Sequence, residues 1–179
     1  MADWQRPLTP DERALVASAR QACFDRYAGV KVPHRSCGIS LAETFGLSTP
    51  PYQSLRRGGI TGLGECGTAV AGRLVLGELL GDPDPGGATT PALRDAVVDY
   101  QQRWRARAGV QGSSVCNDLV APFSRFRGPE RASFCTNLAA ETAALVAEVL
   151  IRGGHPVTVV PVPQRDKLGS VRATGCGPL

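Results

Sequence analysis

Six cysteines carry the side chains best suited to redox or metal chemistry in this chain of 179 residues. They are Cys23, Cys37, Cys66, Cys116, Cys135 and Cys176. The first residues, MADWQRPLTPDER, are polar and charged early, unlike a secretory signal, so we expect a cytoplasmic protein. In a reducing compartment, cysteines serve metal, cluster or redox chemistry more often than structural disulfides. The alternative is a set of buried free thiols that behave as small hydrophobic residues.

Four of these cysteines share one predicted setting. Cys37, Cys66, Cys116 and Cys135 each fall at the beginning of a predicted helix or within its first two turns. Unpaired N–H groups and the helix dipole at such positions lower the pKa of a thiol and favour the thiolate. A thiolate is both a nucleophile and a ligand for iron–sulfur clusters and zinc. No C-x-x-C pair occurs, which disfavours zinc-ribbon and thioredoxin-like sites.

Glycine is concentrated around one of the four cysteines. In GGITGLGECGTAVAG, residues 58–72, six of fifteen residues are glycine, and Cys66 lies near the middle. Glycine adopts positive φ readily and lets the backbone approach a cofactor or a second thiol closely. The segment is therefore a candidate wall of a cysteine site. The alternative is an ordinary loop followed by helix-packing notches.

Three other positions are weaker candidates. His34 precedes Cys37 by three residues, where it would be able to ligate a metal or activate the thiol, although an exposed residue at a helix start is the simpler interpretation. Glu65 is a candidate proton donor beside Cys66, or it only complements the helix dipole. Cys176 lies near the C-terminus and is interpreted as a spare thiol or a regulatory one.

Helical periodicity dominates the chain and determines which elements must position these residues. A capping box at Thr9 and Glu12 opens the first helix, which ends at Gly29. Thr90 and Pro129 mark further helix starts. Additional helices are expected over 34–46, 66–81 and around 113–126. PVTVVPVP, residues 156–163, reads as an edge strand or a docked tail.

The predicted fold class is all-α. We expect a compact helical bundle over residues 1–155, followed by an irregular, extended C-terminal tail over 156–179. Hydrophobic residues make up 42% and charged residues 20%, and the net charge of +4 is dispersed, so we expect no nucleic-acid partner. No run of eighteen apolar residues occurs, so no membrane span is expected. The small-residue helix 69–81 leaves self-association open.

The order of these features resembles the C_GCAxxG_C_C family of small helical proteins described as redox-active. The matching segments are HRSCGISLAETFGL, GGITGLGECGTAVAG, QGSSVCNDL and FCTNLAAETAALVAEVL, and the resemblance covers roughly Cys23 to Leu150. The family's four cysteines fall on Cys37, Cys66, Cys116 and Cys135. Glu65 stands where the family name has glycine, and Gly72 is displaced from the named spacing, so the cysteines transfer better than the glycines.

The resemblance implies a cytoplasmic redox or electron-transfer protein. Related sequence occurs in part of split-Soret cytochromes, where the cysteines are associated with an iron–sulfur cluster. It thus implies a [2Fe–2S] or [4Fe–4S] cluster on Cys37, Cys66, Cys116 and Cys135, an unidentified redox partner protein, and a role as an oxidoreductase or an electron-transfer component. Three alternatives stay open: a zinc site on the same residues, a metal-free thiol–disulfide redox protein, and a non-catalytic helical subunit of a larger complex.

Overall fold

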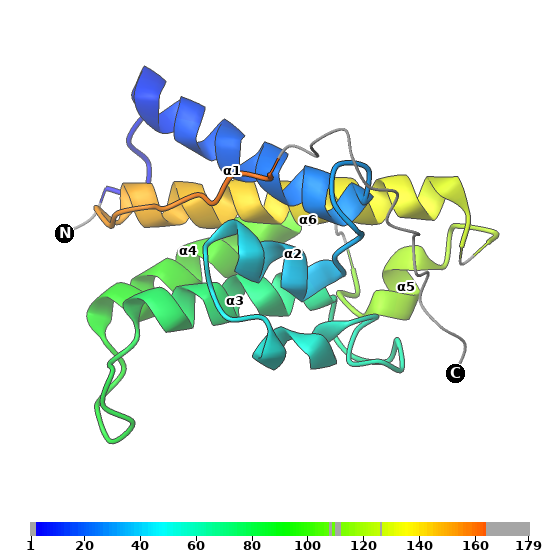
Figure 1. Ribbon diagram of the computed structural model, residues 1–179. Coiled ribbons are helices and arrows are strands. Elements are labelled where there is room, and N and C mark those ends of the chain that lie inside the picture. Colours follow the sequence, from blue (N-terminus) through cyan, green and yellow to red (C-terminus); the bar gives the residue numbers. More distant parts are fainter. Residues whose placement is uncertain (1–2, 108, 110–111, 126, 164–179) are drawn as a thin grey trace.

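The computed structural model describes residues 3–107, 109, 112–125 and 127–163 (Figure 1). Seven helical elements follow one another in this part of the chain, and the described residues contain no β-strand, only an isolated bridge between Glu65 and Val115. The predicted all-α class is therefore confirmed. The elements are α1 (Pro10–Ala28), α2 (Cys37–Thr44), the 3₁₀ helix η1 (Pro50–Leu55), α3 (Gly67–Leu80), α4 (Pro91–Arg107), α5 (Cys116–Val120) and α6 (Pro129–Arg152).

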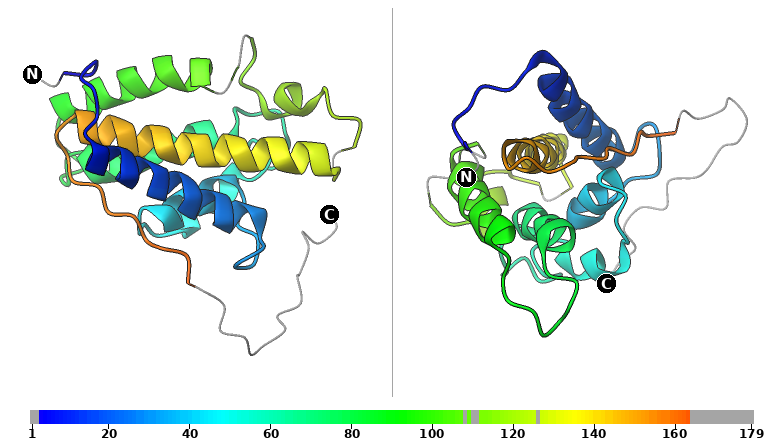
Figure 2. Two further views of the ribbon diagram at one scale, coloured as in Figure 1. Left: turned by 90° about the horizontal axis from the view of Figure 1, so that it is seen from above. Right: turned by 90° about the vertical axis from the view of Figure 1, so that its left-hand side faces the viewer.

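Helix α6 forms the centre of the bundle. Seen along its axis, it is surrounded by α1, α2, α3 and α4, each of which contacts it (Figure 2, right). Most of its residues from Thr136 to Ile151 are buried. Among helices in the described ranges, only α6 is long and apolar enough to be a candidate membrane span by length and composition, with a mean hydropathy of 1.5. This hydropathy belongs to an 18-residue stretch of α6, and 78% of that stretch is buried in the protein, as expected for a core helix.

Local capping signals account for both ends of α1 and for the start of α4. The Thr9 hydroxyl accepts from the Glu12 N–H at 3.2 Å, and the Glu12 carboxylate accepts from the Thr9 N–H at 2.8 Å, completing the predicted capping box. Gly29 ends α1 with φ +72°. The Thr90 hydroxyl accepts from the Leu93 N–H at 3.1 Å at the start of α4. These bonds involve near neighbours in sequence, so the sequence predicts them well.

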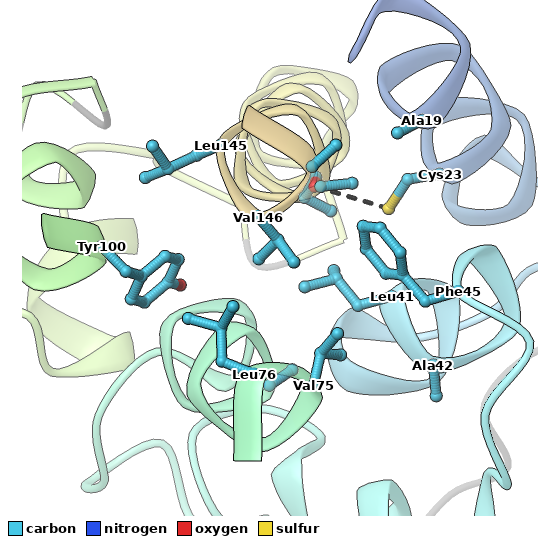
Figure 3. Packing of buried hydrophobic residues seen from close by; sticks show 14 of the residues in the cluster. Ala19, Cys23, Leu41, Ala42, Phe45, Val75, Leu76, Tyr100, Leu145 and Val146 are labelled. Carbon is cyan, nitrogen blue, oxygen red and sulfur yellow. Dashed lines mark hydrogen bonds between the residues drawn. The ribbon is translucent and has the colours of Figure 1, made fainter. Parts of the chain in front are cut away.

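The core joins α1, α2, α3, α4 and α6, and Cys23 belongs to it (Figure 3). Cys23 is fully buried, and its thiol lies 3.4 Å from the Ala139 carbonyl of α6 and 3.5 Å from the Ser40 hydroxyl of α2. Burial raises the pKa of the Cys23 thiol to about 11. Cys23 is thus an inert structural residue.

Two glycines of α3 give a matched test of this packing. A Cβ on Gly72 would lie 2.2 Å from the Tyr100 hydroxyl oxygen, whereas a Cβ on Gly77 would meet nothing within 4 Å. We expect Gly77→Ala to raise the free energy of unfolding by about 0.5–1 kcal/mol, because alanine is the better helix former. Gly72→Ala should lower it by about 1–3 kcal/mol through overpacking. Urea unfolding of both variants measures the difference, and equal effects would contradict the packing described.

The segment after α6 runs as an extended chain against the bundle. The Val160 N–H donates to the Thr44 carbonyl at 2.9 Å, and the Arg26 guanidinium donates to the Val160 carbonyl at 2.9 Å. Of the two predicted forms, edge strand or docked tail, the structure has the docked tail. A single chain beside helices has no neighbouring strand with which to form a ladder. Residues 164–179, including Cys176, lie outside the described part of the chain.

Candidate functional site

Four helices deliver one cysteine each to a single cavity. Cys37 is the first residue of α2, Cys66 directly precedes α3, Cys116 is the first residue of α5, and Cys135 lies in the second turn of α6. All four line this cavity, although the first and last are 98 positions apart in sequence (135 − 37). Figures 1 and 2 show α5 and the start of α6 at one end of the molecule. The sequence-predicted site residues are therefore brought together.

The rest of the cavity wall is largely apolar. The residues beside the cysteines are Gly67, Tyr27, Thr68, Leu119, Val120, Phe134 and Leu138. No carboxylate or imidazole is among the described residues that line it. The thiols are therefore the only strong metal ligands facing this space within the described ranges.

Every pair among the four thiols is close enough to interact electrostatically. Cys37 is affected by Cys66, Cys135 and Cys116, Cys116 is affected by Cys66 and Cys135, and Cys135 is affected by Cys66. Each thiolate opposes ionisation of the next, because like charges repel in a poorly solvated site. A cation among them would remove this opposition.

The predicted lowering of thiol pKa is wrong for three of the four cysteines. Burial, followed by repulsion from Cys66, raises the pKa of Cys37 to about 12 and that of Cys116 to about 11. Burial also raises the pKa of Cys135. A helix of five residues such as α5 has a weak dipole, and loss of water outweighs it. These thiols are therefore neutral in the metal-free protein at physiological pH.

The glycine-rich segment is built for close approach to the cysteines. Gly58 has φ +57°, and a Cβ there would lie 2.4 Å from the Cβ of Cys116. A Cβ on Gly67 would lie 2.1 Å from the Leu55 carbonyl oxygen and 3.2 Å from the Cβ of Cys37. These two glycines therefore let the backbone pack directly against two of the four cysteines.

Backbone hydrogen bonds hold this segment against α5. The Cys116 N–H donates to the Gly64 carbonyl at 2.9 Å, the Cys66 N–H donates to the Ser114 carbonyl at 2.8 Å, and the Asn117 N–H donates to the Gly62 carbonyl at 2.9 Å. The segment and α5 are thus joined, and Cys66 and Cys116 are positioned by the same pairing.

Tyr27, at the end of α1, was not expected at this site. Its side chain lines the cavity with the thiols of Cys37 and Cys135, with which its hydroxyl interacts, and burial raises the pKa of Tyr27 well above the usual value. The ring packs edge-to-face on His34, with the ring centroids 4.9 Å apart. In the sequence, Tyr27 fits the helical period of α1 and carries no other signal, so only the fold reveals its contact with the thiols.

Two arginines supply positive charge near the thiols. Arg131, in the first turn of α6, interacts electrostatically with Tyr27, Cys116 and Cys135, and favours ionisation of each. Arg57 acts in the same way on Cys116, and its backbone hydrogen-bonds to the Cys37 thiol. These groups would compensate the negative charge of thiolate ligands.

The other candidate residues lie elsewhere. The His34 ring hydrogen-bonds through Nδ1 with the Tyr27 carbonyl and does not line the cavity. Glu65 forms an ion pair with Arg73 and lines a neighbouring pocket beside Tyr100 instead. Neither residue faces the thiols in this structure.

As placed, the thiols do not surround one point. Within the described ranges, no group of three or more His, Cys, Asp or Glu residues is arranged to hold a metal ion. A tetrahedral zinc site needs all four sulfurs about 2.3 Å from one ion. An iron–sulfur cluster spreads four thiolates over two or four irons, so no iron takes more than two of them. Four thiolates are a donor set that both kinds of site use.

Comparison with protein-family models, with curated proteins and with solved structures found no match to this chain.

Proposed function

We propose that this protein is a cytoplasmic redox protein whose Cys37, Cys66, Cys116 and Cys135 bind an iron–sulfur cluster and exchange electrons with a partner protein. The observation that carries the proposal is that four cysteines from four helices line one apolar cavity. The resemblance to the C_GCAxxG_C_C family supports it through the same four residues. A bound cluster would supply one-electron transfer.

The residues around the thiols have defined tasks in this proposal. The four cysteines would be the ligands, and the Tyr27 hydroxyl and the Arg57 backbone would donate hydrogen bonds to sulfur. Arg131 would offset negative charge. Phe134 and Leu138 would keep water from the site, which helps to set its reduction potential.

The thiol–disulfide alternative has less support. A switching pair needs a thiolate at physiological pH, and burial raises the pKa of Cys37, Cys116 and Cys135. Raised pKa values suit ligands that lose their protons only when a metal binds.

Anaerobic purification of the full chain tests the proposal. We expect a brown protein with visible absorbance, and both iron and acid-labile sulfide in proportion to the chain. If the purified protein contains zinc but no acid-labile sulfide, the four cysteines form a zinc site and not a cluster site. A colourless, metal-free protein that still fails to take up iron and sulfide under reconstitution would contradict the proposal.

Tyr27→Phe tests the hydrogen bonds to sulfur. Removing the hydroxyl should lower the reduction potential by about 40 mV, if one hydrogen bond of about 1 kcal/mol favours the more negative, reduced state. The variant should keep its iron, because the ring is retained. Voltammetry of the variant and of the wild type measures the shift. An unchanged potential would show that the hydroxyl does not act on the site.

A further inference from the structure

The loop of residues 56–63 packs directly against two of the four cysteines that line the cavity. On its inner side, the Arg57 backbone hydrogen-bonds to the Cys37 thiol, and Gly58 packs on the Cβ of Cys116. On its outer side, most of the loop is exposed. A protein bound to this outer side would be separated from two cysteine ligands only by the loop itself.

The outer side of this loop combines apolar and positively charged side chains. Leu63 is 74% exposed and Ile60 is 45% exposed, and both are among the most exposed large hydrophobic residues of the described chain. The side chains of Arg56 and Arg57 are exposed at the start of the same loop. Apolar contacts with arginine at their edge are typical of protein–protein interfaces.

The backbone holds this surface in an unusual conformation. Ile60 has φ +72° and Arg57 has φ +50°, a region that costs a non-glycine residue about 1–2 kcal/mol. The Ile60 N–H donates to the Arg56 carbonyl at 2.6 Å, and Gly62 is tied to Asn117 of α5. The loop is therefore fixed to the site, and its exposed side chains are displayed from a constrained backbone.

We infer that the outer face of the loop, formed by Arg56, Arg57, Ile60 and Leu63, docks an acidic one-electron carrier protein. The inference rests on the proposed function and gives the unidentified partner a place and a charge. Arginines favour a partner with carboxylates around its own redox centre, because opposite charges speed encounter and orient the complex. One electron leaves one centre and enters the other, and no covalent bond forms or breaks.

Binding of the full chain to an acidic plant-type [2Fe–2S] ferredoxin tests this inference. Calorimetry with oxidised ferredoxin should show binding at about 20 mM salt that weakens strongly at about 500 mM, where charges are screened. The doubly substituted variant Arg56→Glu with Leu63→Ser should bind ferredoxin at least about tenfold more weakly than the wild type. Arg57 and Ile60 are left intact, because their backbone supports the site.

A matched control lies at the opposite end of the bundle. Arg94 is exposed in the first turn of α4, and Leu79 is 42% exposed near the end of α3. The variant Arg94→Glu with Leu79→Ser makes the same change in charge, removes an exposed leucine as well, and should bind ferredoxin like the wild type.

The outcomes separate this inference from the proposed function. An iron-loaded protein that binds no ferredoxin, or whose loop and control variants bind equally, overturns the docking face and leaves the cluster standing. A protein without iron overturns the proposed function whatever the binding result. Binding of phosphatidylglycerol vesicles or duplex DNA, lost on Arg56→Glu while ferredoxin does not bind, overturns the inference in favour of that other partner.

Discussion

Under the proposed function, Cys66→Ser should bleach the protein and remove most of the bound iron. A serine hydroxyl is a much poorer ligand for iron than a thiolate, and three remaining cysteines would hold a cluster weakly. The substitution changes little else: the Cys66 sulfur lies 3.1 Å from the Thr68 hydroxyl, a neighbour that serine would also be able to hydrogen-bond. Visible absorbance and iron content, measured on anaerobically purified protein, check the result.

The loss of iron in Cys66→Ser should also lower the free energy of unfolding. The free energy of metal binding adds to that of folding, so the wild type should lose more stability on metal removal than the variant does. Cys23→Ala is the first control: it should keep the iron but lower the free energy of unfolding by about 1 kcal/mol, because it leaves a small cavity in the core. Cys176→Ser, which changes a cysteine outside the family pattern, should keep both iron and stability.

Thiol labelling of the same variants distinguishes the alternatives. If Cys66→Ser leaves another cysteine newly reactive under oxidising conditions, with no metal lost, then the thiol–disulfide interpretation is correct. If it changes neither metal, thiol reactivity nor stability, Cys66 has no redox role. The helical-subunit alternative would then lead.

Gly58→Ala should also cost the protein the proposed cluster, although it removes none of the proposed ligands. The new methyl group would lie 2.4 Å from the Cβ of Cys116 and 2.7 Å from the Gly64 carbonyl oxygen, so that cysteine or the loop must shift. Neither atom belongs to a flexible side-chain end. We expect iron content to fall to a small fraction of the wild-type value, with a stability loss of several kcal/mol that includes about 1–2 kcal/mol for the left-handed backbone.

Gly59→Ala is the matched control for this prediction. Gly59 also has positive φ, at +74°, but a Cβ there would meet nothing within 4 Å. This variant should lose only the backbone cost of about 1–2 kcal/mol and should retain its iron. Equal iron contents in Gly58→Ala and Gly59→Ala would show that the close approach to Cys116 does not matter for the site.

Most of the fold was predictable because its signals are local. The capping box at Thr9 and Glu12, the Thr90 cap and Pro129 at the start of α6 are each confirmed, and each depends on residues within three positions. The segment around Val160 was harder, because an extended run of β-branched residues and prolines fits both an edge strand and a docked tail. The bonds to Thr44 and Arg26 decided between them, and both come from distant parts of the chain.

The four cysteines of the candidate site were predictable from the sequence, but their surroundings were not. Their shared position at predicted helix starts singled out the four cysteines, whereas Tyr27 and Arg131 carry no signal in the sequence. The expected direction of the thiol pKa shift was wrong, because the position of a cysteine along a helix is local but its burial is not. The contacts of Cys37 with Arg57 and of Cys116 with Gly58 likewise join separate segments.

By itself, the sequence determined the helical class, the starts of α1, α4 and α6 and the candidate cysteines, because capping, periodicity and residue type act over a few positions. Only the tertiary structure decided that four cysteines face one cavity, that Cys23 faces the core instead, and that Gly58 and Gly67 touch two of the four. The packing of α2, α3 and α5 around the start of α6 sets these contacts. Burial and proximity, which govern thiol ionisation and ligand geometry, arise only from that packing.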